Sequence, residues 1–272
     1  AAVVGLTAFA FFSSYLASID HGVTGVDLDT LPPEVAAEAA AFRAPYALPQ
    51  SVLTILAGSW PLGLAGAYLA FSTIGGEFSF GTIRPSLTTG LSRRTFLGAR
   101  LIALGAIVVA MCGVVLVLGI ALPIVLAVVG QDLPAVPAPS LGGLLGEAAA
   151  RCLAAIVYVA LGSLVAVLTR SITTATVMTL TILLVEAVVS SSVRSGPLRW
   201  IADYSPTDAA NAVIDNAHRI AGAVPPVDDF ARIALASPPA VPPLASLVVA
   251  LGWLAGLLAA AFLVFERADI TD

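Results

Sequence analysis

The sequence contains no lysine, few charged residues of any kind and only two cysteines. All twelve basic residues are arginine, and charged residues make up 11% of the 272 positions. A Walker A phosphate loop requires its lysine, so an ordinary P-loop ATPase is excluded and any ATP hydrolysis must come from another polypeptide. Both cysteines, Cys112 and Cys152, lie within apolar runs, where a packing role is expected rather than a disulfide.

Apolar residues dominate what is present. They account for 59% of the chain, and the mean hydropathy is +1.01. Soluble domains carry about 25% charged residues, so this composition predicts an all-α integral membrane protein forming one transmembrane domain. A helix needs about 20 mostly apolar residues to cross the hydrocarbon core. Six segments meet that requirement: residues 1–19, 51–74, 101–129, 144–169, 172–193 and 244–265.

The short loops predict how these spans are oriented. Short arginine-rich loops stay on the cytoplasmic side of a membrane, and the segment 75–100 carries four arginines and one acid. This segment and both termini are therefore expected in the cytoplasm, with segments 20–50 and 194–243 outside. The first apolar run has no basic region before it, which favours a first span over a signal peptide.

The segment 75–100 is longer than a hairpin between two helices requires, and it is rich in Gly, Ser, Thr and Pro. We interpret it as a docking surface on the cytoplasmic side, with Ser92 as the cap of the helix that follows. The alternative is a solvated loop whose arginines only fix the topology.

The outer segment 194–243 contains one amphipathic stretch. The sequence Ser-Pro-Thr-Asp at 205–208 predicts a helix start, and Gly222 predicts its end. The helix is too short to cross and should rest at the outer interface, with His218 on its solvated face. Its expected apolar face consists of Ala210, Val213, Ile214, Ala217 and Ile220.

Glu186 is the ionisable residue that falls clearly within a predicted span. An ionisable group at that depth costs roughly 2.5–3.5 kcal/mol on insertion scales, which makes it a functional candidate. Thr179 and Ser190 share its helical face. A structural role remains open, in which Glu186 pairs with Arg151, with Arg194 or with a loop dipole, or is protonated and bonded to a hydroxyl.

Other residues in the spans have simpler interpretations. Glu147 and Arg151 are spaced i and i+4, which predicts an interfacial ion pair that contributes little to stability. Gly63 belongs to one stripe of small residues, and Gly252 and Gly256 belong to another. Such stripes let neighbouring helices approach closely. No metal-ligand spacing is found, and neither a metal nor a nucleic-acid partner is expected.

Between the second and third predicted spans the sequence reads Glu-Phe-x-x-Gly-Thr-Ile-Arg, followed by a polar stretch and Ser-Arg-Arg. This pattern resembles the permease subunits of type-2 ABC transporters. The match is clearest over residues 77–100. Along the rest of the chain, the six spans, the long segment between spans five and six, and the short charged tail agree with the family.

The resemblance implies an exporter of drugs, lipids or other amphiphiles in a bacterial plasma membrane. Two permease chains, identical or different, would pair with two ATPase chains that bind ATP and Mg²⁺, and no catalytic residue would lie on this chain. A short helix wedged in the ATPase would carry the motion, with Glu77 pairing with Arg84 or a partner residue and the two phenylalanines filling apolar pockets. The implied coupling residues are Glu77, Phe78, Phe80, Gly81, Thr82, Arg84, Arg93 and Arg94.

In that family, spans two and five line the substrate path. Trp60, Thr179, Glu186 and Ser190 are then candidates for contact with the substrate, although Trp60 could equally be a packing residue. The competing hypothesis is an ion-coupled secondary carrier that uses Glu186. Such carriers usually bury several ionisable groups, and a membrane enzyme acting on lipids would need a cluster of acid, base or nucleophile that is not found.

Overall fold

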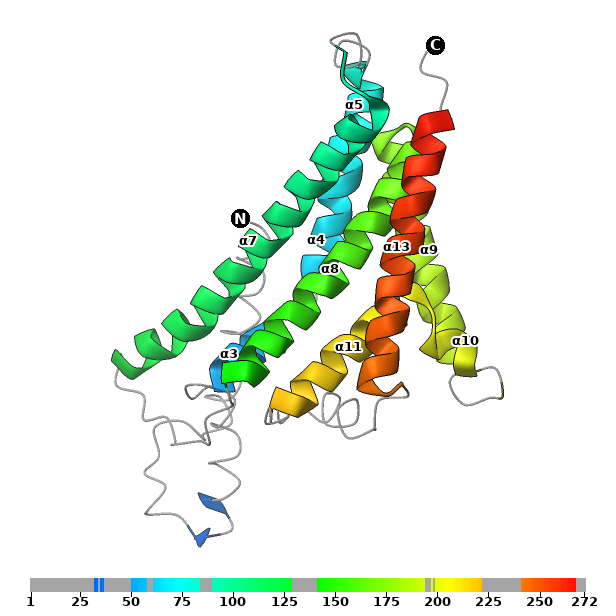
Figure 1. The fold of residues 1–272 in the computed structure, drawn as a ribbon. Coiled ribbons are helices and arrows are strands. Elements are labelled where there is room, and N and C mark those ends of the chain that lie inside the picture. The colour runs from blue at the N-terminus through cyan, green and yellow to red at the C-terminus, as the bar shows by residue number, and fades with distance from the viewer. Residues whose placement is uncertain are drawn as a thin grey trace. The chain divides into compact units, whose positions relative to one another are not determined.

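The computed structural model describes residues 32–33, 35–36, 50–57, 61–83, 90–128, 141–193, 197, 199–221 and 241–267, and no strand occurs among them. The chain is helical through these residues (Figure 1). The helices are α3 (Gln50–Ala57), α4 (Pro61–Ala70), the π-helix η3 (Phe71–Gly75), α5 (Gly76–Ser79), α7 (Arg93–Val128), α8 (Leu141–Thr169), α9 (Ile172–Val193), α10 (Arg199–Asp203), α11 (Pro206–Ala221) and α13 (Pro243–Arg267).

Four of these helices contain a stretch that is long and apolar enough to cross a membrane. The stretches are Arg93–Leu122, Leu141–Thr169, Ile172–Ser190 and Pro243–Arg267. The prediction of an all-α membrane protein is therefore confirmed for the described residues. The count of six stays a prediction, because residues 1–19 lie outside the described part and residues 51–74 are divided among shorter helices.

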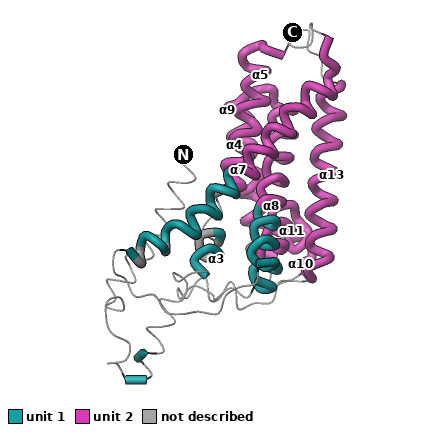
Figure 2. Tube along the Cα trace, turned by 60° about the vertical axis from the view of Figure 1, so that its left-hand side comes forward, with its two compact units in different colours: residues 1–61, 111–151, 215–239 teal, residues 62–110, 152–214, 240–272 magenta. Residues whose placement is uncertain are grey.

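The chain divides into two compact units (Figure 2). Unit 1 comprises residues 1–61, 111–151 and 215–239, and unit 2 comprises residues 62–110, 152–214 and 240–272. Helices α7, α8 and α11 each contribute residues to both units.

The packing of α3 against α7 forms the apolar core of unit 1. Val52, Leu56, Val115 and Leu122 are buried together. A Cβ added at Gly119 would lie 2.8 Å from the Cα of Val52, so the two backbones approach as closely as glycine allows. The Ser51 hydroxyl donates a hydrogen bond to the Gly119 carbonyl at 3.1 Å, which fixes the position of α3 along α7.

Unit 2 contains a similar close approach between α4 and α8. A Cβ at Gly162 would lie 2.8 Å from the carbonyl oxygen of Ala67, and a Cβ at Gly63 would lie 2.9 Å from the Tyr158 ring. Helix α8 is thus the neighbour that approaches Gly63. Gly252 and Gly256 on α13 meet no described atom within 4 Å of such a Cβ, so their packing role stays a prediction.

The ends of the helices follow local sequence signals. The Ser92 hydroxyl accepts a hydrogen bond from the Thr95 amide at 3.1 Å and caps α7, as expected. Arg170, with φ of 52°, forms the tight turn between α8 and α9. Helix α11 begins at Pro206 and ends at Ala221, directly before Gly222.

One side chain of α11 lies where it was not expected. His218 is buried, so its predicted position on the solvated face is wrong. Ile220 is 70% exposed, and the placement of the apolar face at the outer interface stays a prediction.

The close approach at Gly162 generates a stability prediction. Gly162→Ala places a methyl group against backbone atoms of Ala67, which cannot rotate away, and should destabilise the fold by about 1–3 kcal/mol. Gly105→Ala is the matched control, because a Cβ there meets nothing within 4 Å and alanine favours a helix by about 1 kcal/mol over glycine. Thermal unfolding in detergent measures both variants, and equal melting temperatures would contradict the packing described.

Candidate functional site

The chain reverses direction after η3 and α5, and we call residues 76–83 the elbow. The Phe80 amide donates to the Gly76 carbonyl at 2.8 Å, and the Thr82 amide donates to the Glu77 carbonyl at 3.1 Å. Gly81 has φ of +67° between them. A side chain at that φ is strained, so the predicted role of Gly81 in permitting the turn has a physical basis in the structure.

The two elbow phenylalanines lie in different environments. Phe80 is 78% exposed. Phe78 packs edge-on against Phe265 of α13, with ring centroids 6.0 Å apart. Of the two residues expected to fill pockets on a partner, Phe78 is therefore engaged within its own chain, and Phe80 is the one that faces outward.

Glu77 joins the elbow to α7. Its carboxylate forms an ion pair with Arg100, and its side chain is 12% exposed. The expected intramolecular partner, Arg84, lies outside the described residues. Arg100 sits two turns into α7, where helical geometry carries its side chain back toward the start of the helix and the elbow.

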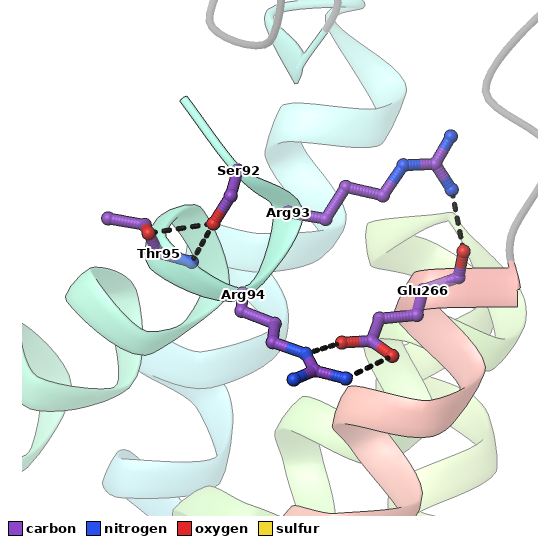
Figure 3. Close-up of polar contacts among 5 residues, drawn as sticks. All are labelled: Ser92, Arg93, Arg94, Thr95 and Glu266. Carbon is purple, nitrogen blue, oxygen red and sulfur yellow. Dashed lines mark hydrogen bonds and ion pairs between the residues drawn. The ribbon is translucent and has the colours of Figure 1, made fainter. Parts of the chain in front are cut away.

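Arg93 and Arg94 both bind Glu266 at the end of α13 (Figure 3). Arg93 Nη1 donates to the Glu266 carbonyl at 2.9 Å. Arg94 Nε donates to Glu266 Oε1, and its Nη2 donates to Oε2 at 3.1 Å. The preceding residue, Phe265, is 1% exposed and stacks on Phe96 with centroids 5.9 Å apart. We call these contacts the clamp.

The clamp could not be found from the sequence alone. From the sequence, arginines near a helix start are interpreted as signals of membrane topology. A Phe-Glu pair near the chain end is interpreted as the edge of a membrane span. Both interpretations are compatible with the residues, and only the approach of α7 and α13 brings the partners together, across 172 positions of sequence for Arg94 and Glu266.

Glu186 has a backbone partner. Its Oε1 accepts a hydrogen bond from the Thr207 amide at 2.8 Å. Thr207 is the second residue of α11, so the carboxylate satisfies one of the free amides at a helix N-terminus and lies at the positive end of the helix dipole. Of the structural roles considered for Glu186, the structure shows one, the interaction with a backbone dipole.

Glu186 also lines a cavity of about 400 Å³ within unit 2. Ser190 lies beside it in the same wall, whereas Thr179 is buried elsewhere with no hydrogen-bond partner for its hydroxyl. Trp60 lies outside the described residues. The cavity is lined by Thr181, Ile182, Val185, Glu186, Val189, Ser190, Ile201, Ser205 and Pro206. An apolar wall with one carboxylate and a few hydroxyls suits a molecule that is itself amphiphilic.

Unit 1 contains a buried charged cluster, whereas the sequence predicts an ion pair at the membrane interface. Glu147 is fully buried and accepts hydrogen bonds on Oε1 from Arg151, at 2.9 Å from Nε and 2.8 Å from Nη2. His218 Nδ1 lies 3.4 Å from the same oxygen. The predicted ion pair is therefore confirmed, whereas its expected interfacial position is wrong, because both side chains are buried and His218 of α11 lies against them.

The comparisons with known proteins identify a family for this chain. A family model described as ABC-2 family transporter protein matches residues 2–270, which is nearly the whole chain. The elbow, the clamp and the Glu186 cavity all fall within the matched range. No curated protein matches the sequence.

Burial of the Glu147–Arg151 pair predicts a strong effect of breaking it. Glu147→Ala leaves the Arg151 guanidinium buried without its counter-charge, and should cost about 3–5 kcal/mol of folding stability. The matched control is Asp203→Ala, which removes another i,i+4 pair whose Arg199 partner is 53% exposed and should cost about 0–1 kcal/mol. Unfolding in detergent measures the difference, and similar losses in the two variants would refute burial of the pair.

Proposed function

The chain belongs to the ABC-2 family of transporter proteins, and we propose on that premise that it is an export permease driven by a separate ATPase. The family supplies the transmembrane permease component of ABC transporters, a multi-pass membrane protein that works with an ABC ATPase. The resemblance to type-2 ABC permeases is thus confirmed. ATP and Mg²⁺ would bind on the partner, because the chain has no lysine for a Walker A loop.

The assembly proposed for the working transporter follows from the same membership. Two permease chains, the same or different, would pair with two ATPase chains in a bacterial plasma membrane. Both termini and the elbow would face the cytoplasm, as the arginine distribution predicts.

The observation that carries this proposal is the exposed Phe80 at the tip of a braced elbow. Phe80 is 78% exposed, so a partner that covers its ring removes a large apolar surface from water, which favours binding. Aromatic side chains contribute much of the binding free energy of interfaces. The elbow beneath it is held to α7 by Glu77 and to α13 by Phe78. A partner that grips Phe80 could therefore move two spanning helices together.

The cavity at Glu186 is our candidate for part of the substrate path. Its apolar wall would accept the hydrophobic part of a drug, lipid or other amphiphile, and the carboxylate and hydroxyls would meet a polar head. Glu186 sits where α9 meets the start of α11, so a ligand bound there would contact both a spanning helix and the outer segment.

The ion-coupled carrier hypothesis has less support. It requires Glu186 to bind and release an ion during transport, yet the carboxylate already accepts the Thr207 amide. Transport that survives ATP depletion in vesicles and disappears with the ion gradient would favour that hypothesis.

Docking through Phe80 is tested by Phe80→Ala. Loss of an aromatic anchor of this kind costs about 2 kcal/mol, so ATPase binding should weaken roughly 30-fold. Trp200→Ala is the control, because Trp200 on α10 is also largely exposed, at 60%, but lies outside the elbow. Co-purification of the ATPase and ATP-driven transport in vesicles measure the effect. Unchanged ATPase binding by Phe80→Ala would remove the observation on which the proposal rests.

The substrate path is tested by filling the cavity. Val189→Trp places an indole in the cavity wall and should abolish the stimulation of ATP hydrolysis by transported amphiphiles while leaving basal hydrolysis intact. Leu184→Trp is the control, because Leu184 lies on the same helix and is exposed but does not line the cavity. A panel of fluorescent amphiphiles in reconstituted vesicles measures stimulation and uptake. If both variants behave like the native chain, the cavity is not on the path.

A further inference from the structure

We propose that α13 is a transmission helix that carries movement of the elbow to the rim of the Glu186 cavity. The inference rests on the proposed function, because it takes the elbow as the ATPase contact and the cavity as part of the substrate path. It adds two positioning residues, Glu266 and Trp253, that lie outside both sites and join them.

At the elbow end, α13 is held by two elements, α5 and α7. Phe78 of α5 and Phe96 of α7 pack on the buried ring of Phe265. Arg93 and Arg94 bind the carbonyl and the carboxylate of Glu266. The aromatic contacts resist sideways displacement, and the paired arginines fix the last turn of α13 in register with the first turn of α7 (Figure 3).

Near its middle, at Trp253, α13 contacts the cavity rim. The Trp253 indole Nε1 donates a hydrogen bond to the Tyr204 carbonyl at 2.8 Å. Tyr204 lies between α10 and α11, and its neighbours Ile201, Ser205 and Pro206 line the cavity. The next residue, Thr207, is the one whose amide binds Glu186. A shift of Trp253 would therefore move the segment that positions both the cavity wall and the carboxylate.

Between its two anchors α13 is able to move as one body. It is continuous from Pro243 to Arg267 and has no proline after its first position (Figure 1). Trp253 and Phe265 are twelve residues apart, or about 18 Å at 1.5 Å per residue. Between the anchors its buried residues, Leu257 and Ala261, are spaced i and i+4 and lie on one face of the helix.

The contacts at the two anchors are not needed for insertion of α13 into a membrane. A spanning helix needs apolar surface, whereas the clamp uses charged groups and Trp253 uses a directional hydrogen bond. Such contacts transmit displacement along a helix, because they resist separation at fixed points. The geometry thus links the exposed Phe80 of the elbow to the rim of the Glu186 cavity through one continuous helix.

The test uses the native chain purified with its bound ATPase in lipid nanodiscs. Hydrogen–deuterium exchange is compared without nucleotide and after trapping with ATP, Mg²⁺ and vanadate, in peptides covering residues 76–83 and 200–208. In the wild-type chain, trapping should change exchange in both peptides by about fivefold or more. Glu266→Ala and Trp253→Phe should keep the change at the elbow and lose it at 200–208. Leu251→Val is the matched control, because Leu251 lies on α13, is 46% exposed and belongs to neither anchor, and it should keep both.

The outcomes separate the two ideas. A nucleotide response at 200–208 that survives in both Glu266→Ala and Trp253→Phe would overturn the transmission role of α13 and leave the docking proposal standing. A wild-type response confined to the elbow would do the same. If the wild-type chain binds no ATPase, or if nucleotide changes neither peptide, the proposed function fails and the inference fails with it. Trp253→Phe keeps an aromatic ring at this position and removes the indole N–H that binds the Tyr204 carbonyl.

Discussion

The absence of water in the hydrocarbon core is the constraint on which the structure depends. Every backbone amide and carbonyl that enters the core must be satisfied within the chain. The long helices α7, α8, α9 and α13 meet this requirement over 22 to 36 residues each. The described residues with positive φ, Gly81, Gly90 and Arg170, all lie between helices. Within the described residues, backbone with positive φ is thus found at helix ends, which are also where a partner can reach the chain.

The same constraint decides where charge is tolerated. Glu77 pairs with Arg100, Arg94 pairs with Glu266, and Glu147 pairs with Arg151. Glu186 has no such partner among the described residues and accepts a backbone amide instead. Each of these acids is therefore engaged, and each contact joins two elements or two turns of a helix. In a chain with few charges, these contacts give the apolar helices a defined register that apolar packing alone would leave loose.

Unit 2 contains both sites of the proposed function. The elbow presents an exposed aromatic on a hydrogen-bonded turn, and the cavity presents an amphiphilic wall around Glu186. Helix α13 contacts the elbow through Phe265 and the cavity rim through Trp253, near its middle. One continuous helix that contacts both regions is a physical means of coupling them in the proposed transporter.

The sequence determined the class of protein, the apolar helices, the turn at Gly81 and the helix ends at Ser92 and Pro206. These features depend on composition, length and local hydrogen bonding, which a sequence carries directly. The tertiary structure decided which side chains meet: Glu77 with Arg100, Phe78 with Phe265, Arg94 with Glu266, and His218 with a buried Glu147. Sequence periodicity fixes the face of a helix on which a residue lies, but the neighbour that covers that face depends on the packing of helices far apart in the chain.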